Sequence, residues 1–326
     1  SQFQNYCEEL IQKPEVRRVA VDIETVQPGT HVSILGISHD PGFAMSTRIL
    51  NGRASCLNEQ EELNLWRGFA RLVESKEIIA HNASFDVGVL WLNQGILCRK
   101  IYMDTLLAAH VCWPELPRDL GFIASLCLDV PPWKGSSKEN LSLYNAADCA
   151  NTIGIAEVLE TELKRQKSWD TFLFEMSEHE VALMMQLQGL YVSKEKQQLL
   201  IKEETEKRDE ALAKLDSIFG KRINYDSPKQ LQQLLYIDMG LPVQYKRRKS
   251  ASDPRTITAD ASALRKLARI ASDNPVFNLI LAYKKSNKLV TGFVDITLSS
   301  DSRVHTSYNI TGSKTDDEGR KSFGRW

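Results

Sequence analysis

The chain has 326 residues, of which 42% are hydrophobic and 25% are charged, and its formal net charge is -1 at pH 7. This composition is typical of a folded globular protein with one large domain or two medium ones. A net charge near zero does not indicate a protein that binds nucleic acid through its overall charge. Any basic surface must therefore be local.

Six cysteines are scattered along the chain, with no CxxC pair and no cysteine–histidine cluster at zinc spacing. In a chain of this length, that pattern favours reduced thiols in the protein interior over a disulfide framework. The polar and acidic start is unlike a signal peptide, and no run of about 18 apolar residues predicts a membrane span. We therefore expect a cytoplasmic protein without a membrane partner.

The first half of the chain alternates strand-like and helix-like segments. Short β-rich runs predict strands at residues 17–25, 31–38, 42–50 and 77–82. Apolar residues at helical spacing predict helices at residues 59–76, 84–95, 103–113, 120–128 and 141–166. Strands followed by interleaved helices predict an α/β domain that ends at about residue 168.

The second half is almost entirely helical in pattern. We expect helices at residues 175–189, 193–220, 227–240, 258–272 and 274–296. Ser193, Ser227, Thr258 and Asn274 are the predicted N-caps, and Pro228 and Pro275 take the first helical position after two of them. The change of pattern near residues 166–175 is the predicted domain boundary.

The strand at residues 17–25 carries two carboxylates, Asp22 and Glu24, in an otherwise apolar run. Side chains two apart on a strand share a face, so these two lie together, opposite the apolar side chains. Two neighbouring carboxylates repel unless a positive charge lies between them. A divalent cation with oxygen ligands is one explanation, and a solvated acidic edge strand is the alternative.

Two later segments carry similar groups. Asn82 and Asp86 lie four residues apart where a strand turns into a helix, and Tyr144 and Asp148 lie at i and i+4 on one helix face. Taken singly, Asp86 could simply favour the helix dipole, and Tyr144 could be a half-buried core aromatic residue.

The order and spacing of the three segments resemble the exonuclease motifs of the DEDDy branch of the DEDD 3′–5′ exonuclease superfamily. The sequence reads DIE at 22–24, N-x₃-D at 82–86 and Y-x₃-D at 144–148. The sister branch has a histidine five residues before its last aspartate, and Leu143 stands there in this chain. The resemblance is therefore to the tyrosine branch.

This resemblance implies a metal-dependent 3′–5′ exonuclease. Asp22, Glu24, Asp86 and Asp148 would hold two Mg²⁺ or Mn²⁺ ions, and all four would be catalytic together with Tyr144. A phenol with a pKa of about 10 is a poor general base, so Tyr144 would align the attacking water by hydrogen bonding. Asn82 and Thr25 would contact the substrate, although both also have ordinary roles in a turn and a strand.

The second half resembles, in kind and order, the thumb region of family A DNA polymerases, the group of bacterial DNA polymerase I and phage replicases. The similar segments are residues 177–193, 223–242, 257–268, 280–296 and 303–315. The two resemblances together imply a ribonuclease H-like exonuclease domain, with a mixed sheet flanked by helices, at residues 1–168. A mostly helical thumb-like region would follow at residues 169–326, in a bacterial or phage-infected cell.

In that family the thumb holds duplex DNA through basic and small polar residues. The basic residues that would contact DNA here are Lys284, Lys285 and Lys288 on one helix and Lys246, Arg247, Arg248 and Lys249 in a loop. Such phosphate contacts are independent of sequence and sensitive to salt. The alternative for either group is a solvated charged surface.

The chain ends at Trp326, about where the palm of that family would begin, and TDDEGRKS departs from the expected threonine-glycine-arginine element. We therefore expect no DNA polymerisation by this chain alone. It could be the amino half of a split polymerase with a separate palm–fingers subunit, a truncated chain, or part of a longer chain. An RNA-trimming 3′–5′ exonuclease and a DNA-clamping or assembly subunit are the alternative functions.

Overall fold

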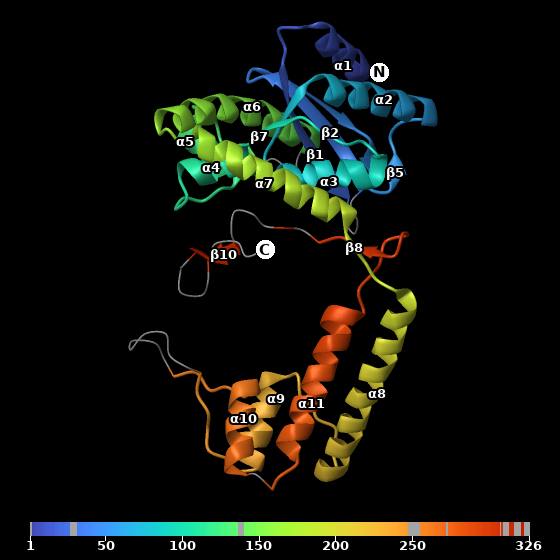
Figure 1. Ribbon diagram of the computed structural model, residues 1–326, viewed down its shortest axis with the longest axis vertical. Coiled ribbons are helices and arrows are strands. Elements are labelled where there is room, and N and C mark those ends of the chain that lie inside the picture. Colours follow the sequence, from blue (N-terminus) through green and yellow to red (C-terminus); the bar gives the residue numbers. More distant parts are fainter. Residues whose placement is uncertain are drawn as a thin grey trace. The chain divides into compact units, whose positions relative to one another are not determined.

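The computed structural model describes residues 2–26, 31–135, 140–246, 255–271, 273–306, 308, 313–315 and 321–322. Its contacts divide most of the chain into two compact units, residues 1–188 (unit 1) and residues 189–305 (unit 2). Unit 1 contains the sheet, and unit 2 is built mainly of helices (Figure 1).

A five-stranded mixed sheet forms the centre of unit 1, in the order β3-β2-β1-β6-β7. β1 pairs antiparallel with β2, as β2 does with β3, whereas β6 runs parallel to both β1 and β7. The bounds of the strands are β1 Arg18–Val26, β2 His31–Asp40, β3 Phe43–Arg48, β6 Glu77–Ala80 and β7 Ile101–Asp104. The predicted α/β fold with a mixed sheet is confirmed.

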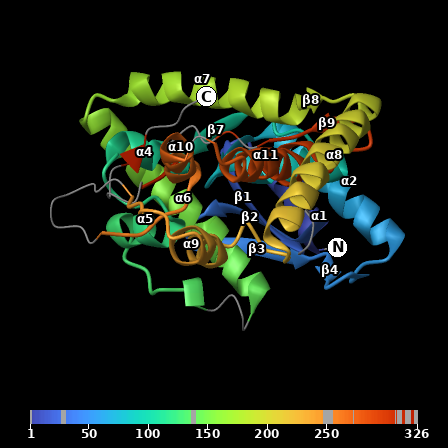
Figure 2. The ribbon, with the colours of Figure 1, turned by 90° about the horizontal axis from the view of Figure 1, so that it is seen from below.

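Helices cover both faces of this sheet (Figure 2). One hydrophobic core joins the sheet to α1 Gln2–Gln12, α2 Glu59–Ser75 and α3 Ala83–Gln94. The other joins it to α4 Thr105–Cys112, α5 Leu120–Cys127 and α6 Leu141–Arg165. Sequence periodicity predicted five of these helices, although α4 begins at Thr105 because Met103 and Asp104 belong to β7. It missed α1, which is short and polar but buries Phe3 and Leu10.

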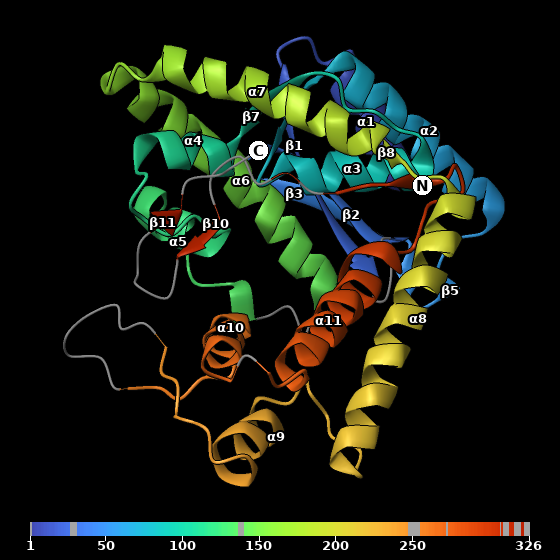
Figure 3. The ribbon, with the colours of Figure 1, turned by 60° about the horizontal axis from the view of Figure 1, so that its bottom comes forward.

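The next helix, α7 Trp169–Gln188, belongs to unit 1 (Figure 3). Near its start Phe172 joins one core, and near its end Leu183 and Leu187 join the other. A hydrogen bond of 2.7 Å between His179 Nε2 and Ser84 Oγ ties α7 to α3. Unit 1 thus extends about a helix beyond the boundary predicted near residue 168, because packing continues after the α/β pattern ends.

Unit 2 has a core of its own, centred on large buried side chains such as Tyr225 and Phe277. Its two longest helices, α8 Lys194–Phe219 and α11 Val276–Leu289, pack against each other. The remaining helical segments are α9 Pro228–Gln232, the π-helix η2 Gln233–Asp238, α10 Ala261–Ile270 and the π-helix η3 Val290–Val294. A short pair, β8 Leu190–Tyr191 with β9 Arg303–Val304, joins the two ends of the unit.

The cap residues of unit 2 follow the sequence prediction in part. Ser193 and Ser227 accept hydrogen bonds at the starts of α8 and α9, as predicted. The prediction that Thr258 caps α10 is wrong, because Asp260 accepts the hydrogen bond from Ala263 N–H. At the start of α11 the N-cap is Pro275 and not Asn274 as predicted, although Asn274 Oδ1 accepts a hydrogen bond from the N–H of Val276.

Short strand pairs lie outside the main sheet. β4 Leu50–Asn51 pairs with β5 Ala54–Ser55, and β10 Ser313–Thr315 pairs with β11 Lys321–Ser322. Within the described ranges, no helix is both long enough and apolar enough to cross a bilayer. The six cysteines are free thiols, and four of them are buried.

Candidate active site

Strand β1 carries the first two acidic side chains. Val19, Val21 and Ile23 belong to one core of unit 1, so Asp22 and Glu24 lie on the opposite face of the strand. The pairing of β1 with β2 shifts register between Glu24 and Thr25. An irregularity of this kind changes the direction of the side chains at the end of a strand.

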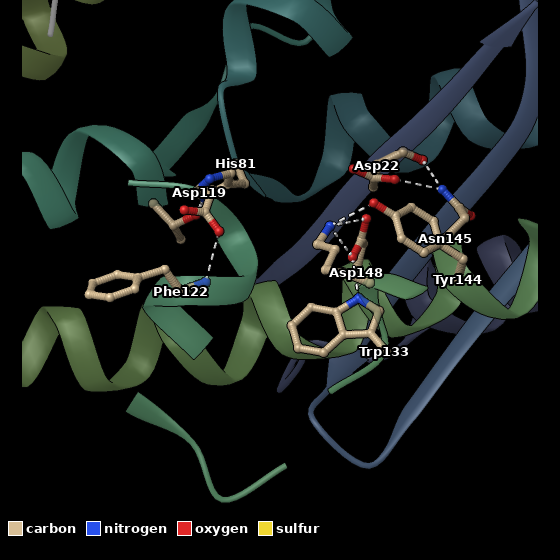
Figure 4. A network of polar contacts seen from close by, with 10 residues as sticks. Asp22, His81, Asp119, Phe122, Trp133, Tyr144, Asn145 and Asp148 are labelled. Carbon is tan, nitrogen blue, oxygen red and sulfur yellow. Dashed lines mark hydrogen bonds and ion pairs between the residues drawn. The ribbon is translucent and has the colours of Figure 1, made fainter. Parts of the chain in front are cut away.

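Helix α6 brings the third acidic side chain to this face. The helix is capped by Asn140 and contacts β1, β2 and β3. Its buried Asp148 lies beside the strand pair, and one carboxylate oxygen of each residue, Asp22, Glu24 and Asp148, lies within 4.8 Å of the others. Figure 4 shows Asp22 and Asp148 facing the same space from β1 and α6.

Asp86 lies just behind this cluster. It is buried in the first turn of α3, and its Oδ1 accepts a hydrogen bond of 3.0 Å from the backbone N–H of Ile23. It does not join the three carboxylates that lie within 4.8 Å of one another. Burial raises its pKa to about 8, and its charge helps to raise the pKa of Asp22.

The acidic groups are crowded enough to resist simultaneous ionisation. Burial raises the pKa of Asp22 well above its usual value, and the charges of Asp86, Asp148 and Glu24 raise it further. Burial and Asp148 likewise raise the pKa of Glu24. A cation among these groups would remove the repulsion, and a set of carboxylate oxygens suits Mg²⁺ or Mn²⁺. The residues present therefore fit a divalent metal.

A cationic side chain already reaches this cluster. The ammonium of Lys134 lies 2.8 and 2.9 Å from the two carboxylate oxygens of Asp148 and 2.8 Å from the hydroxyl of Tyr144. The indole N–H of Trp133 donates to the same carboxylate at 2.5 Å. Neither residue was predicted from the sequence, because both lie in a segment without helical or strand periodicity, about ten residues before Tyr144.

Tyr144 lies one helical turn before Asp148 on α6. Burial raises the pKa of its phenol, and the effect of burial outweighs the opposite effect of Lys134. The phenol is therefore neutral at physiological pH, and its oxygen accepts a hydrogen bond from Lys134. The predicted proximity of Tyr144 to the carboxylates is present in the structure.

The first half of this chain matches the family described as 3′-5′ exonuclease over residues 1–164, and residues 194–320 match DNA polymerase family A. The chain belongs to the 3′-5′ exonuclease family, and its second half is similar to DNA polymerase family A. The exonuclease match covers the carboxylate cluster and Tyr144.

The polymerase relatives are longer than this chain. DNA polymerase I of Synechocystis sp. is 26% identical over 71% of this chain and 25% of its own length, and that of Bacillus subtilis is 27% identical over 72% and 28%. The chain thus spans about a quarter of the length of these relatives. The POL domain of Pol1 from M. smegmatis, solved with DNA primer-template and dNTP, has the same fold, with a TM-score of 0.68 and 23% identity, over 98% of this chain and 53% of its own.

Asn82 occupies a strained position in the exonuclease domain. Its φ of 71° is left-handed, and its backbone N–H donates to Asp104 at 2.9 Å, as does that of Ala83. The exposed Asn82 side chain makes no capping hydrogen bond to α3, so it is not needed to start the helix. Asp104, whose buried carboxylate fixes this turn, was not predicted, because a single aspartate at the end of a strand carries no distinctive signal.

The predicted lysines of the polymerase-like part lie together on unit 2. Lys284, Lys285 and Lys288 line a groove of about 830 Å³ with Arg265 and Asp226. Lys284 Nζ lies 3.8 Å from Asp226 Oδ1, so that charge is partly balanced. The groove is a concave basic surface, as a phosphate-binding surface requires.

The remaining predicted contact residues are placed as follows. Lys246 is exposed, and its backbone N–H donates to Thr256 at 2.9 Å. Thr25 is half-buried beside Glu24 on β1. Arg247, Arg248 and Lys249 lie outside the described residues.

Proposed function

We propose that this chain removes nucleotides from the 3′ end of DNA, as the proofreading part of a family A polymerase. The observation that carries the proposal is the convergence of Asp22, Glu24 and Asp148 from a strand and a helix, with Tyr144 beside them. The printed name of the relatives, DNA polymerase I, favours DNA over RNA as the substrate. The exonuclease part would occupy about residues 1–168, with α7 packed against it, and the thumb-like part would follow it in residues 169–326.

We propose two Mg²⁺ or Mn²⁺ ions as the cofactor, held by the three clustered carboxylates together with Asp86. Ions bound there would supply the charge that activates the attacking water and stabilises the leaving 3′ oxygen. Asp86 would join them by a small adjustment of its buried side chain, or act through its neighbour Asp22. The Tyr144 hydroxyl would hold the water in line by a hydrogen bond, which a neutral phenol can donate.

The substrate would be held at two places. In the exonuclease part, Thr25, beside Glu24 on β1, and the exposed side chain of Asn82 at the start of α3 would contact the terminal nucleotide. In unit 2, the lysine-lined groove would hold duplex phosphates, with Lys246, Arg247 and Arg248 as further contacts. Contacts of this second kind position the DNA without reading its sequence.

The test follows release of mononucleotides from a labelled single-stranded DNA 3′ end in Mg²⁺, with an RNA of the same sequence as competitor. We expect Asp22→Ala combined with Glu24→Ala to abolish release without unfolding the chain. The matched control, Asp209→Ala with Glu210→Ala, removes two exposed carboxylates from α8 and should leave release unchanged.

The possible outcomes separate the alternatives. Undiminished digestion by the Asp22, Glu24 double variant would remove the assigned site. Preferential digestion of the RNA would favour the RNA-trimming exonuclease, and salt-sensitive duplex binding without digestion would favour a clamping subunit.

A further inference from the structure

Three residues form a row across the antiparallel part of the sheet. Asp22 on β1 is paired with Gly36 on β2, and Gly36 is paired with Ser46 on β3. Residues paired in register point to the same face of a sheet, so the side chains of Asp22 and Ser46 lie on one face with the glycine between them. Because Gly36 has no side chain, space is left between the Asp22 carboxylate and the Ser46 hydroxyl.

The side chain of Asn145 spans this gap. It comes from α6, one residue after Tyr144, and it is completely buried. Its Nδ2 donates to Asp22 Oδ2 at 2.7 Å and to the backbone oxygen of Asp22 at 3.1 Å, and Figure 4 shows it pointing at Asp22. Its Oδ1 accepts a hydrogen bond of 2.8 Å from the hydroxyl of Ser46.

These partners determine the orientation of the Asn145 amide. If the amide were turned over, its oxygen would face the backbone carbonyl of Asp22, which can only accept, and the ionised Asp22 carboxylate, which also only accepts. The Ser46 hydroxyl can donate or accept, so it satisfies Oδ1 in the observed orientation, while the Asp22 oxygens determine that orientation. The amide therefore always presents a donor to Asp22.

The glycine at position 36 is necessary for this arrangement. A Cβ at this position would lie 2.2 Å from Asn145 Oδ1 and 2.7 Å from Cys149 Sγ. Real Cβ atoms do not approach other atoms so closely, so any side chain here would displace Asn145 from Asp22. Residues from three strands and one helix thus cooperate to hold one carboxylate.

We propose that Asn145, held by Ser46 over Gly36, is a positioning residue that fixes the orientation of the Asp22 carboxylate for metal binding. The inference rests on the proposed function, because it assigns Asn145 a role towards the metal held by Asp22. Residues that orient a ligand in this way commonly change metal affinity about 10- to 100-fold when they are removed. Asn145 acts on the reaction only through Asp22.

The experiment measures the binding of Mn²⁺ to the full chain by titration calorimetry and by the electron paramagnetic resonance signal of free Mn²⁺. We expect Asn145→Ala to raise the dissociation constant about 10- to 100-fold. Ser46→Ala should raise it less, about 2- to 10-fold, since one neutral hydrogen bond is lost, and Ser46→Thr should keep the wild-type value.

A double variant distinguishes positioning from general stabilisation. Because Ser46 acts through Asn145, the combination of Ser46→Ala with Asn145→Ala should bind Mn²⁺ no more weakly than Asn145→Ala alone. The matched control is Ser38→Ala, since the Ser38 hydroxyl bonds Asp40 and Phe43 backbone oxygens in the β2–β3 hairpin. It should lower stability without changing Mn²⁺ affinity.

Two results would overturn the proposal. One is wild-type Mn²⁺ affinity in a folded Asn145→Ala variant, or in Ser46→Ala if Asn145→Ala does not fold. The other is a full additional loss of affinity when the two substitutions are combined. Asp22→Ala is the reference: if it binds Mn²⁺ as well as the wild type does, both this role and the proposed function fail.

Discussion

Replacing Lys134 with methionine removes the ammonium from the carboxylate cluster and keeps a side chain of similar length. In the metal-free protein, this ammonium is the cation that balances the buried carboxylate of Asp148, which is 5% exposed. A metal held by Asp148 would need the same space, so the lysine must give up its contact when the metal binds. The substitution should therefore lower the stability of the metal-free protein and raise its affinity for the metal.

The structure sets the size of this effect. A hydrogen bond to a charged group contributes about 1.5–3 kcal/mol, but the Lys134 side chain is 38% exposed, and solvent screening weakens the pair. We take about 1–2 kcal/mol for the contribution to metal-free stability. In the wild type, metal binding breaks the Lys134–Asp148 contact and loses its contribution of about 1–2 kcal/mol. The variant has no such contact to lose, so Lys134→Met should bind Mn²⁺ about 5- to 30-fold more tightly.

The assay combines urea unfolding in EDTA with Mn²⁺ titration calorimetry on the same two proteins. The matched control is Lys164→Met, which removes an exposed lysine paired with Glu160 on the same helix. It should change neither quantity appreciably. Weaker Mn²⁺ binding by Lys134→Met would refute the reasoning, because it would show that the lysine supports the metal instead of competing with it.

Three further predictions concern pH, the basic groove and the sheet glycine. Folded Asp86 keeps its proton up to a pKa of about 8, whereas in the unfolded chain it ionises near pH 4. The free energy of unfolding measured with urea in EDTA should therefore fall as pH rises from 5 to 8, by up to about 1.4 kcal/mol per pH unit, and a rise over that range would contradict this. Substituting alanine for Lys284, Lys285 and Lys288 should make the slope of log binding constant for duplex DNA against log salt concentration less steep by about 2–3, since Lys284 is partly neutralised by Asp226. Alanine at the exposed α8 residues Lys194, Lys202 and Lys214 is the control and should leave this slope unchanged. Gly36→Ala should cost about 1–3 kcal/mol in urea unfolding, because its methyl group overlaps Asn145, and an unchanged midpoint would show that α6 can move away.

Local pattern was sufficient for most of the fold. The alternation in β1 placed Val19, Val21 and Ile23 on one side and the two carboxylates on the other, because a strand offers only two faces. Local pattern was insufficient where two nearby residues could each cap a helix, as Thr258 and Asp260 could before α10. It was also insufficient where packing continues past a change in composition, as it does at α7. The short helix α1 was missed although Phe3, Tyr6, Cys7 and Leu10 recur at helical spacing, because its first residues are mostly polar; it packs against α2.

The site was predictable only in part. Asp22, Glu24, Tyr144 and Asp148 could be identified from motif spacing, which reflects the periods of a strand and a helix. Lys134 reaches Asp148 through a segment with no regular period, so its contact depends on the path of that segment in three dimensions. The bridge by Asn145 likewise depends on strand register and on the angle at which α6 crosses the sheet, neither of which a single sequence specifies.

The most direct measurement is the anomalous scattering of Mn²⁺ in crystals of the full chain. We predict a peak within coordination distance, about 2.0–2.3 Å, of carboxylate oxygens from Asp22, Glu24 and Asp148, with the Lys134 ammonium displaced from Asp148. A density map with Mn²⁺ bound elsewhere, and with Lys134 still on Asp148 at saturating metal, would contradict the assignment of these carboxylates as the catalytic metal site.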